Sequence, residues 1–280
     1  MKIFSFSNYQ STKNRPSFGV NFNSPKLKFS QDDFYVRING YGKNYHWVEK
    51  VKETADIAVK FIRENLDFES VLRYITGGVT KANQFTMDLE KRNHTGILRA
   101  VRKDWRFGSD WVNGKIITKY DGKKSRYKLY YDRLEEVVNK PLKNPYKNFG
   151  LTRPVHNKDE GKFLEHSDEK YINHALDMVS DLYKVLKERY IKKEATKSDL
   201  DNINSIVAEI RWILAHATPW ERGSDAISNT FMRALYKAIG IKTYPLKRGV
   251  SLDLEAYCTN LNEYKQNFES YFYRKPEIID

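Results

Sequence analysis

The stretch from Ile203 to Gly240 has the pattern of two amphipathic helices joined by a tight loop, and it constrains the fold more than any other part of the chain. Apolar residues recur at intervals of three and four in both halves, the spacing that lines up side chains on one face of a helix. They are Ile203, Ile206, Val207, Ile210, Ile213 and Leu214 in the first half, and Ile227, Phe231, Ala234, Leu235, Ala238 and Ile239 in the second. The sequence therefore predicts a helical hairpin with a buried face on each helix.

The loop between these helices, residues 218–225 with the sequence TPWERGSD, has the residue types of a helix end followed by a helix start. Pro219 cannot continue the first helix, because it lacks an amide hydrogen and its ring clashes with the preceding turn. The second helix opens at Gly223, where open backbone amides with Arg222 beside them predict an anion site. The alternative is an ordinary helical hairpin in which the side chain of Ser224 or Asp225 caps the second helix.

The charge of the chain favours an acidic partner. Its 49 Lys and Arg residues against 36 Asp and Glu residues give a net charge of +13, which suits nucleic acid, an anionic membrane surface or a phosphate-bearing small molecule. Because the basic residues are spread along the chain and mixed with acidic ones, we do not expect a nucleic-acid binder. The lone Cys258 excludes a disulfide framework and a CxxC metal site, so we predict no metal. No apolar run approaches the roughly 18 residues of a membrane span.

Four other segments have helical patterns. Residues 47–62 predict one helix, and a second begins at residue 67 and is expected to stop at Gly77-Gly78. A long helix begins at residue 167, with acidic residues in its first turn and basic residues at its end. Residues 253–273 predict a further helix.

The strongest strand signal is an alternating pattern in residues 115–120 and 126–131, which flank Asp121-Gly122 and predict a β-hairpin. Its aromatic and basic residues could suit single-stranded nucleic acid, but a solvated two-stranded ribbon is the more usual structure. Residues 139–163 contain three prolines and predict an irregular connection. Residues 1–32, rich in Ser, Asn, Lys and Pro, predict a loosely ordered leader.

The sequence WILAHATPWERGSDAISNTFMRALYKAIGI, followed by LKRGVSLDLEA, carries a resemblance to a known family. The most specific correspondence is Pro-Xaa-Xaa-Arg-Gly-Ser-Xaa-Ala at residues 219–226, followed by Asp-Xaa-Glu-Ala at residues 253–256. His166, Tyr171 and the Asp-Leu-Tyr at residues 181–183 also fall in register. This part of the chain, residues 166 to about 270, resembles the AvrB family of bacterial type III effectors, which belongs with Fic and Doc to the Fido fold group.

The resemblance implies a mainly helical, Fido-like bundle with a β-hairpin flap and a second, smaller lobe. Residues 33–280 would form this single domain, with the hairpin near residues 115–131, and we expect a monomer. In the family the Arg of Arg-Gly-Ser reaches the phosphates of a nucleotide. The resemblance therefore implies that Arg222, Gly223 and Ser224 bind nucleotide.

The resemblance also implies residues that complete the cleft. The family's amino-terminal threonine, which contacts the nucleotide, is placed at Thr95. The aspartate that follows the loop corresponds to Asp253, which we predict to be catalytic. The second predicted catalytic residue is the upper-lobe histidine, placed at His166, and His174, two turns further along the helix, is its rival.

The related Fic enzymes use the motif HPFxxGNGxxR, in which the histidine is the general base for AMP transfer. Here Thr218 occupies the place of that histidine, and threonine cannot act as a base near neutral pH. AMP transfer is therefore disfavoured, unless His216, two residues earlier, acts as a shifted base. A sugar transfer needs a stabilised leaving diphosphate, which Arg222 and the helix amides could provide, and a carboxylate such as Asp253.

We therefore expect an AvrB-like effector that transfers a sugar from a nucleotide-sugar to a Ser or Thr hydroxyl of a host regulatory protein. The nucleotide or nucleotide-sugar would be a substrate, and a nucleoside diphosphate a ligand. Secretion would place the protein in the host cytoplasm, without a lipid anchor, because Lys2 stands where N-myristoylation requires glycine. The alternatives are a Fic-type AMP or nucleotidyl transferase, and a non-catalytic nucleotide-binding adaptor acting on host signalling proteins.

Overall fold

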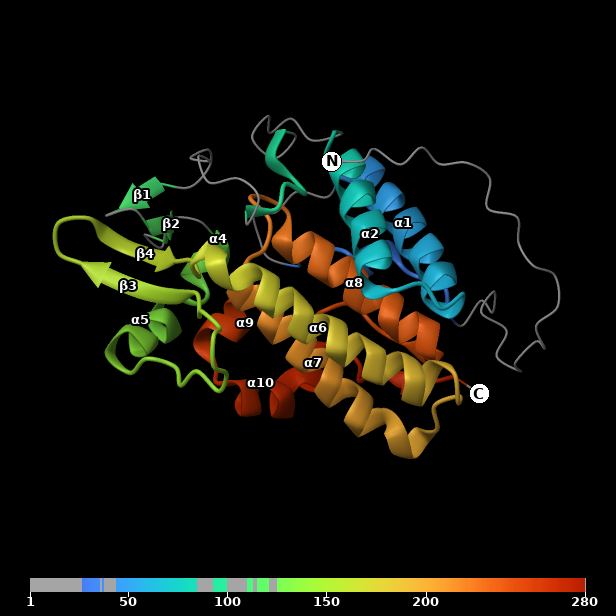
Figure 1. The fold of residues 1–280 in the computed structure, drawn as a ribbon. Coiled ribbons are helices and arrows are strands. Elements are labelled where there is room, and N and C mark those ends of the chain that lie inside the picture. Colours follow the sequence, from blue (N-terminus) through green and yellow to red (C-terminus); the bar gives the residue numbers. More distant parts are fainter. Residues whose placement is uncertain are drawn as a thin grey trace.

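The computed structural model describes residues 27–35, 37, 44–84, 93–99, 110–112, 115–120 and 125–279. Within these residues the chain is mainly helical, as expected, with a small antiparallel sheet at one end (Figure 1). Residues 1–26 of the predicted leader lie outside the described residues, whereas Leu27 is already buried. In the described part of the chain, no helix has both the length and the apolar composition to span a membrane.

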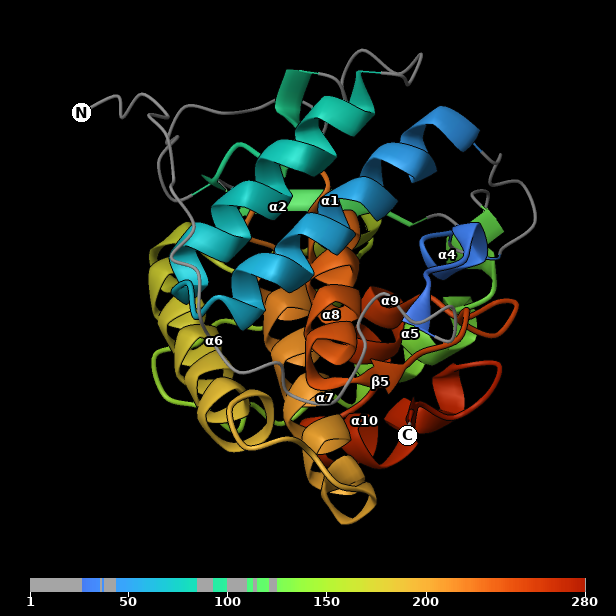
Figure 2. The same cartoon turned by 90° about the vertical axis from the view of Figure 1, so that its right-hand side faces the viewer.

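The predicted helical hairpin forms the centre of the molecule. Helix α8 lies between α7 on one side and the α1–α2 pair on the other, and α6, α9 and α10 also pack on α7 (Figures 1 and 2). The bounds are α1 Tyr45–Arg63, α2 Phe68–Asn83, α6 Ile172–Leu186, α7 Leu200–Ala217, α8 Ser224–Ile239, α9 Leu252–Cys258 and α10 Leu261–Asn267. Short 3-10 turns at Gln31–Asp33, Glu169–Tyr171, Lys197–Asp199 and Phe268–Tyr271, and a π turn at Lys187–Ile191, extend or connect them.

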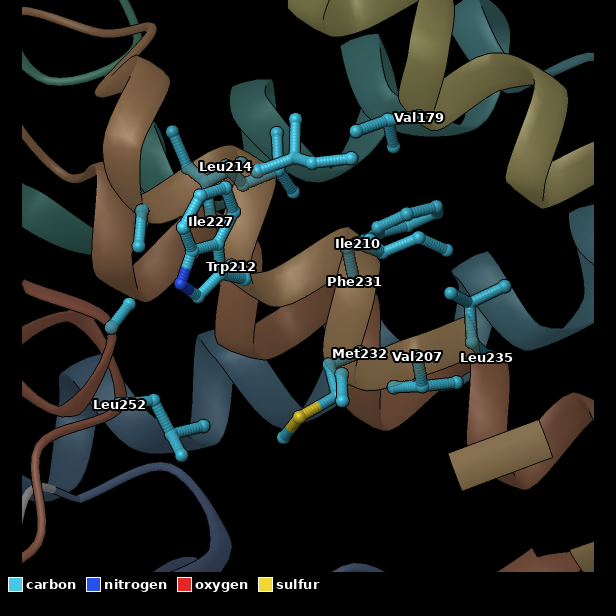
Figure 3. Packing of buried hydrophobic residues seen from close by; sticks show 14 of the residues in the cluster. Val179, Val207, Ile210, Trp212, Leu214, Ile227, Phe231, Met232, Leu235 and Leu252 are labelled. Atoms are coloured by element: carbon cyan, nitrogen blue, oxygen red, sulfur yellow. The ribbon is translucent and has the colours of Figure 1, made fainter. Parts of the chain in front are cut away.

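The two predicted apolar faces meet in one core. Figure 3 shows side chains from α6, α7, α8 and α9 in this cluster, including Val207, Phe231 and Leu235. The Phe231 ring lies 5.6 Å from the ring of Phe68 on α2 and 6.1 Å from that of Tyr183 on α6, centroid to centroid. The Phe231 side chain thus packs α8 against two helices that are distant from it in the sequence, and this contact helps to fix the position of α8.

The four-stranded sheet has the order β1-β2-β4-β3, and its strands pair antiparallel. The strands are β1 Asp110–Val112, β2 Lys115–Lys119, β3 Arg153–Asn157 and β4 Gly161–Glu165, and a separate pair joins β5 Ile241–Lys242 to β6 Glu277–Ile278. The prediction that residues 139–163 form an irregular connection is therefore wrong in part, because they contain β3 and the start of β4. Pro154 is compatible with β3, since that strand lies at the edge of the sheet.

The predicted hairpin is correct only in its first strand. Residues 126–131 are not a strand but lie in α4 (Ser125–Lys128), a turn and the start of α5 (Tyr131–Asn139). The physical reason is the position of the buried side chains, Tyr127, Tyr130, Leu134 and Val137, which recur at intervals of three and four. A six-residue window shows the alternation, but the longer window shows the helical period.

Two predicted helix ends also differ. Helix α2 continues through Gly77-Gly78, because Gly78 allows a close contact with α1: a Cβ there would lie 2.3 Å from the Thr54 side chain. Residues 253–273 form α9, α10 and a 3-10 turn instead of one helix. At the break, Thr259 is extended and its carbonyl accepts a hydrogen bond from the Trp212 indole, 3.1 Å away.

His216 is a core residue of α7. Its Nδ1 lies 3.1 Å from the Thr152 carbonyl and its Nε2 3.0 Å from the Ala256 carbonyl, and the side chain has no solvent exposure. Burial lowers its pKa to about 3, although both carbonyl contacts favour the protonated ring. A ring enclosed in this way cannot reach a substrate, which argues against the shifted-base hypothesis.

We expect Phe231→Ala to lower the free energy of unfolding by about 3–5 kcal/mol, because it leaves a cavity between α2, α6 and α8. Urea denaturation followed by circular dichroism measures this. Leu129→Ala, at a side chain that is 56% exposed, should change stability by no more than about 0.5 kcal/mol. Similar losses in both variants would contradict this account of the core.

We expect His216→Gln to flatten the acid side of the stability curve. The folded pKa of about 3 lies below the unfolded value of 6.5, so the parent protein takes up a proton on unfolding between these values and loses stability as the pH falls from 6.5. Removing this group should reduce the loss between pH 7 and pH 5.5 by about 1 kcal/mol in urea denaturation. Val207→Ala on the same helix should lower stability and keep the parent's pH dependence.

Candidate functional site

The loop between α7 and α8 is held by a short segment, residues 95–99, that lies beside it. Thr95 forms a parallel bridge with Arg222, and Leu98 an antiparallel bridge with Trp220. The Gly96 amide donates to the Arg222 carbonyl at 3.2 Å, and the Arg99 amide donates to the Pro219 carbonyl at 2.9 Å. The structure therefore brings Thr95 and Arg222, two predicted nucleotide-binding residues, next to each other across 127 residues of sequence.

Gly223 is required at its position for two reasons. Its φ of +85° lies in the left-handed region that favours glycine, and a Cβ there would lie 2.8 Å from the Thr95 methyl carbon. Thr95 itself is held in place, since the Asn83 amide donates to its hydroxyl at 2.5 Å. The threonine methyl and the glycine thus pack as a matched pair at the start of α8.

The first turn of α8 has no side-chain cap. Gly223 is the N-cap residue, so the prediction that Ser224 or Asp225 caps the helix is wrong. The Ser224 hydroxyl instead bonds back to the loop: it accepts from the Trp220 amide at 3.2 Å and donates to the Trp220 carbonyl at 3.1 Å. A helix start without a side-chain cap favours an anion, because its first amides have no partner within the helix.

Arg99 is a residue of the candidate site that the sequence patterns did not indicate. Its side chain is buried, and its guanidinium donates to the carbonyls of Thr218, Ala217 and Ser167 at 2.7, 2.8 and 3.1 Å. It satisfies the carbonyl end of α7 and connects it to the segment after β4. Burial lowers the pKa of Arg99 to about 10, so it stays charged at neutral pH. The available signal was a basic residue inside an apolar run.

His166 follows directly after β4 and reaches the loop. Its Nε2 lies 2.7 Å from the Thr118 hydroxyl and its Nδ1 lies 3.4 Å from the Thr218 hydroxyl. Burial, together with the charges of Arg99 and Arg222, lowers the pKa of His166 to about 3, while Asp253 opposes them. The ring is therefore neutral near pH 7. The rival, His174, is on the exposed side of α6 and away from this group.

Asp253 is the second residue of α9, not its N-cap, which is Ser251. One carboxylate oxygen accepts from the Ser251 hydroxyl at 2.5 Å and from the Leu254 amide at 2.9 Å; the other accepts from Arg126 at 2.5 Å. Burial alone would raise the pKa of Asp253, but Arg126 and Ser251 outweigh it and hold the pKa below its usual range. Asp253 is therefore ionised, and its charge acts on His166.

Asp225 is a second carboxylate of the site that the sequence analysis did not single out. Arg211, whose side chain is 1% exposed, donates to it at 2.7 Å. Burial raises the pKa of Asp225, and the nearby charge of Asp253 raises it further, against the effect of Arg211. The two carboxylates therefore differ: the pKa of Asp253 lies below its usual range, and the pKa of Asp225 lies above it.

A cavity of about 740 Å³ opens beside His166. Its lining includes Arg99, His166 and Ser167, together with Val137 of α5 and the segment Phe149–Pro154. The sequence analysis missed this cavity because its walls come from segments that lie far apart in the sequence. Among the residues that the structure describes, no group of three or more His, Cys, Asp or Glu side chains is placed to hold a metal ion.

Comparison with known proteins agrees with the sequence resemblance. Residues 127–275, more than half of the chain, match the AvrB_AvrC family, described as "Avirulence protein". The chain is also 29% identical over 109 residues to Avirulence protein B of Pseudomonas savastanoi pv. glycinea, a match that covers 38% of this chain and 31% of that protein. The chain thus matches about a third of the length of this relative. The family match includes His166, Arg222 and Asp253 but not Thr95. The chain belongs to the AvrB_AvrC family of avirulence proteins.

Proposed function

We propose that the protein is a Fido-like effector that transfers a sugar from a nucleotide-sugar to a Ser or Thr hydroxyl of a host regulatory protein. The observation that carries the proposal is one group of residues: Arg222 beside an uncapped helix start, with the ionised Asp253 and the neutral His166 close enough to interact electrostatically. Family membership supports delivery from a bacterium into a host cell as the setting of this activity.

The start of α8 suits the diphosphate of the donor. The uncapped amides and the helix dipole favour an anion, and the Arg222 guanidinium adds charge-assisted hydrogen bonds. These groups would stabilise the charge that develops on the nucleoside diphosphate as it leaves. Thr95, bridged to Arg222, would line the same pocket.

Asp253 is suited to stabilise the sugar in the transition state and to accept the proton of the acceptor hydroxyl. In the transfer, the bond between the sugar's anomeric carbon and the diphosphate breaks with its electron pair on the diphosphate, and the acceptor oxygen bonds to that carbon. An ionised carboxylate stabilises the positive charge on the sugar in this transition state. The acceptor proton becomes acidic as the new bond forms and passes to Asp253. A low pKa is compatible with this role, since the carboxylate must be charged before the reaction.

The cavity beside His166 suits the acceptor segment of the host protein. Its volume is large enough for a side chain, and His166, which lines it, lies 3.4 Å from the Thr218 hydroxyl of the loop that carries Arg222. With a pKa of about 3, His166 is a weak base, so we assign it a positioning role for the acceptor hydroxyl. The Fic-type alternative is less favoured, because Thr218 replaces the motif histidine and His216 is enclosed in the core.

We expect labelled UDP-, GDP- or dTDP-sugars, incubated with the protein and with plant or animal cell lysates, to label a host protein. Arg222→Gln should reduce the rate of labelling by about 100-fold or more, because it removes a charged donor from the leaving diphosphate. Arg73→Gln, which removes an arginine that is 78% exposed on α2, is the matched control and should label at the parent's rate.

The same experiment separates the alternatives. Labelling from ATP rather than from a nucleotide-sugar would replace sugar transfer with nucleotidyl transfer. Binding of nucleoside diphosphates in calorimetry without transfer from any donor would favour the non-catalytic adaptor. Labelling that persists in Arg222→Gln would contradict the assignment of the α8 start as the diphosphate site.

A further inference from the structure

Arg126 connects the α4 turn to the predicted catalytic carboxylate. Its Nη2 donates to Asp253 at 2.5 Å, and the two side chains are 18% and 11% exposed. The charge of Arg126 also acts on His166 and on Asp225. Arg126 therefore lies within the group of charges that forms the candidate site, although it is 96 residues before Arg222 in the sequence.

A neighbouring ion pair, between Arg133 and Glu255, holds α5 against α9. Arg133 of α5 donates to both carboxylate oxygens of Glu255 on α9, at 3.0 and 2.9 Å. The Tyr130 hydroxyl donates to the same carboxylate at 2.7 Å and accepts from the Ser251 amide at 2.9 Å. These contacts anchor α5 to α9 by themselves, so Arg126 is not needed for that purpose.

The Asp253 carboxylate is likewise held without Arg126. The oxygen that does not face Arg126 accepts from Ser251 and from the Leu254 amide, which fixes its orientation on α9. Arg126 can therefore change its partner while the carboxylate stays in place. A diphosphate is a strong competitor for the guanidinium, because phosphate oxygens match its fork geometry and carry more charge than one carboxylate.

We propose that Arg126 is a second diphosphate-binding residue, and that binding of a nucleoside diphosphate or nucleotide-sugar moves its guanidinium from Asp253 to the phosphates. The inference rests on the proposed function and links donor binding to catalysis. Until the donor binds, the charge of Arg126 balances the negative charge of the Asp253 carboxylate. Once Arg126 has turned away, Asp253 faces the sugar as an uncompensated charge and accepts a proton more readily. Donor binding would thus activate the carboxylate.

Isothermal titration calorimetry with UDP, GDP, dTDP and ADP tests this through the sign of two effects. Arg126→Gln should weaken binding of the preferred diphosphate by about tenfold or more, because a charge-assisted contact is lost. Asp253→Asn should strengthen binding severalfold, because it removes both the competing partner of Arg126 and a like charge. Arg126→Lys, which keeps the charge without the fork, should fall between the parent and Arg126→Gln.

Arg133→Gln is the matched control, since it removes the parallel arginine from the neighbouring pair. It should lower thermal stability and leave the dissociation constant within about twofold of the parent's, with folding of every variant checked by circular dichroism. If Arg126→Gln and Asp253→Asn both weaken binding, the pair is structural and the proposal is overturned. If Arg222→Gln weakens binding and Arg126→Gln does not, the proposal fails while the proposed function stands. If the parent binds none of the four diphosphates, the proposed function fails and this inference with it.

Discussion

The site depends on one buried guanidinium. Arg99 donates to the last carbonyls of α7 and to the segment that carries His166, while its backbone amide donates to the loop at Pro219. A helix end in the interior needs partners for its free carbonyls, and here a single side chain supplies them for two segments. This contact adds to the direct contact between the Thr218 hydroxyl and Nδ1 of His166 in holding the loop beside the histidine. The chemistry proposed for the loop therefore relies on a residue that also lines the cavity beside His166.

The second general feature is that neighbouring acidic and basic groups have pKa values shifted in different directions. Burial, together with the charges of Arg99, Arg222 and Arg126, keeps the His166 imidazole neutral, while Arg126 and Ser251 keep Asp253 ionised. Asp225 has the opposite tendency because it shares the region with Asp253 and is buried. Such a separation of pKa values within one small region is typical of functional sites, because stability alone does not require it.

Sequence periodicity predicted the parts of the fold that extend over many residues. The α7–α8 hairpin followed from two long apolar patterns, and the left-handed Gly240 ends α8. Short windows misled, because six alternating residues at 126–131 fit both a strand and the first turn of a helix. The predicted helix end at Gly77-Gly78 was wrong for a different reason. Gly78 is present in the helix because of a close tertiary contact with Thr54, and such a contact leaves no local signal in the sequence.

The residues of the candidate site were less predictable from pattern. The proximity of Thr95, His166 and Arg222 came from the family resemblance, since no spacing rule relates residues so far apart. Arg99, Arg126 and Asp225 were missed because each acts through a partner that only the folded chain supplies. Their roles in binding and catalysis stay predictions.

The left-handed conformation of Thr218 has a consequence for the proton on His166. Glycine would adopt this backbone with less strain, so the threonine hydroxyl is kept at a cost of about 1 kcal/mol. That hydroxyl has one proton, which it can donate to the Ala215 carbonyl, 3.0 Å away. A carbonyl oxygen has no proton to give in return. If the proton is used there, the contact with Nδ1 of His166 requires the ring to donate, and Nε2 then accepts from Thr118. In that arrangement the imidazole lone pair on Nε2 is occupied by Thr118, and the ring presents a fixed dipole instead of a site for a further proton.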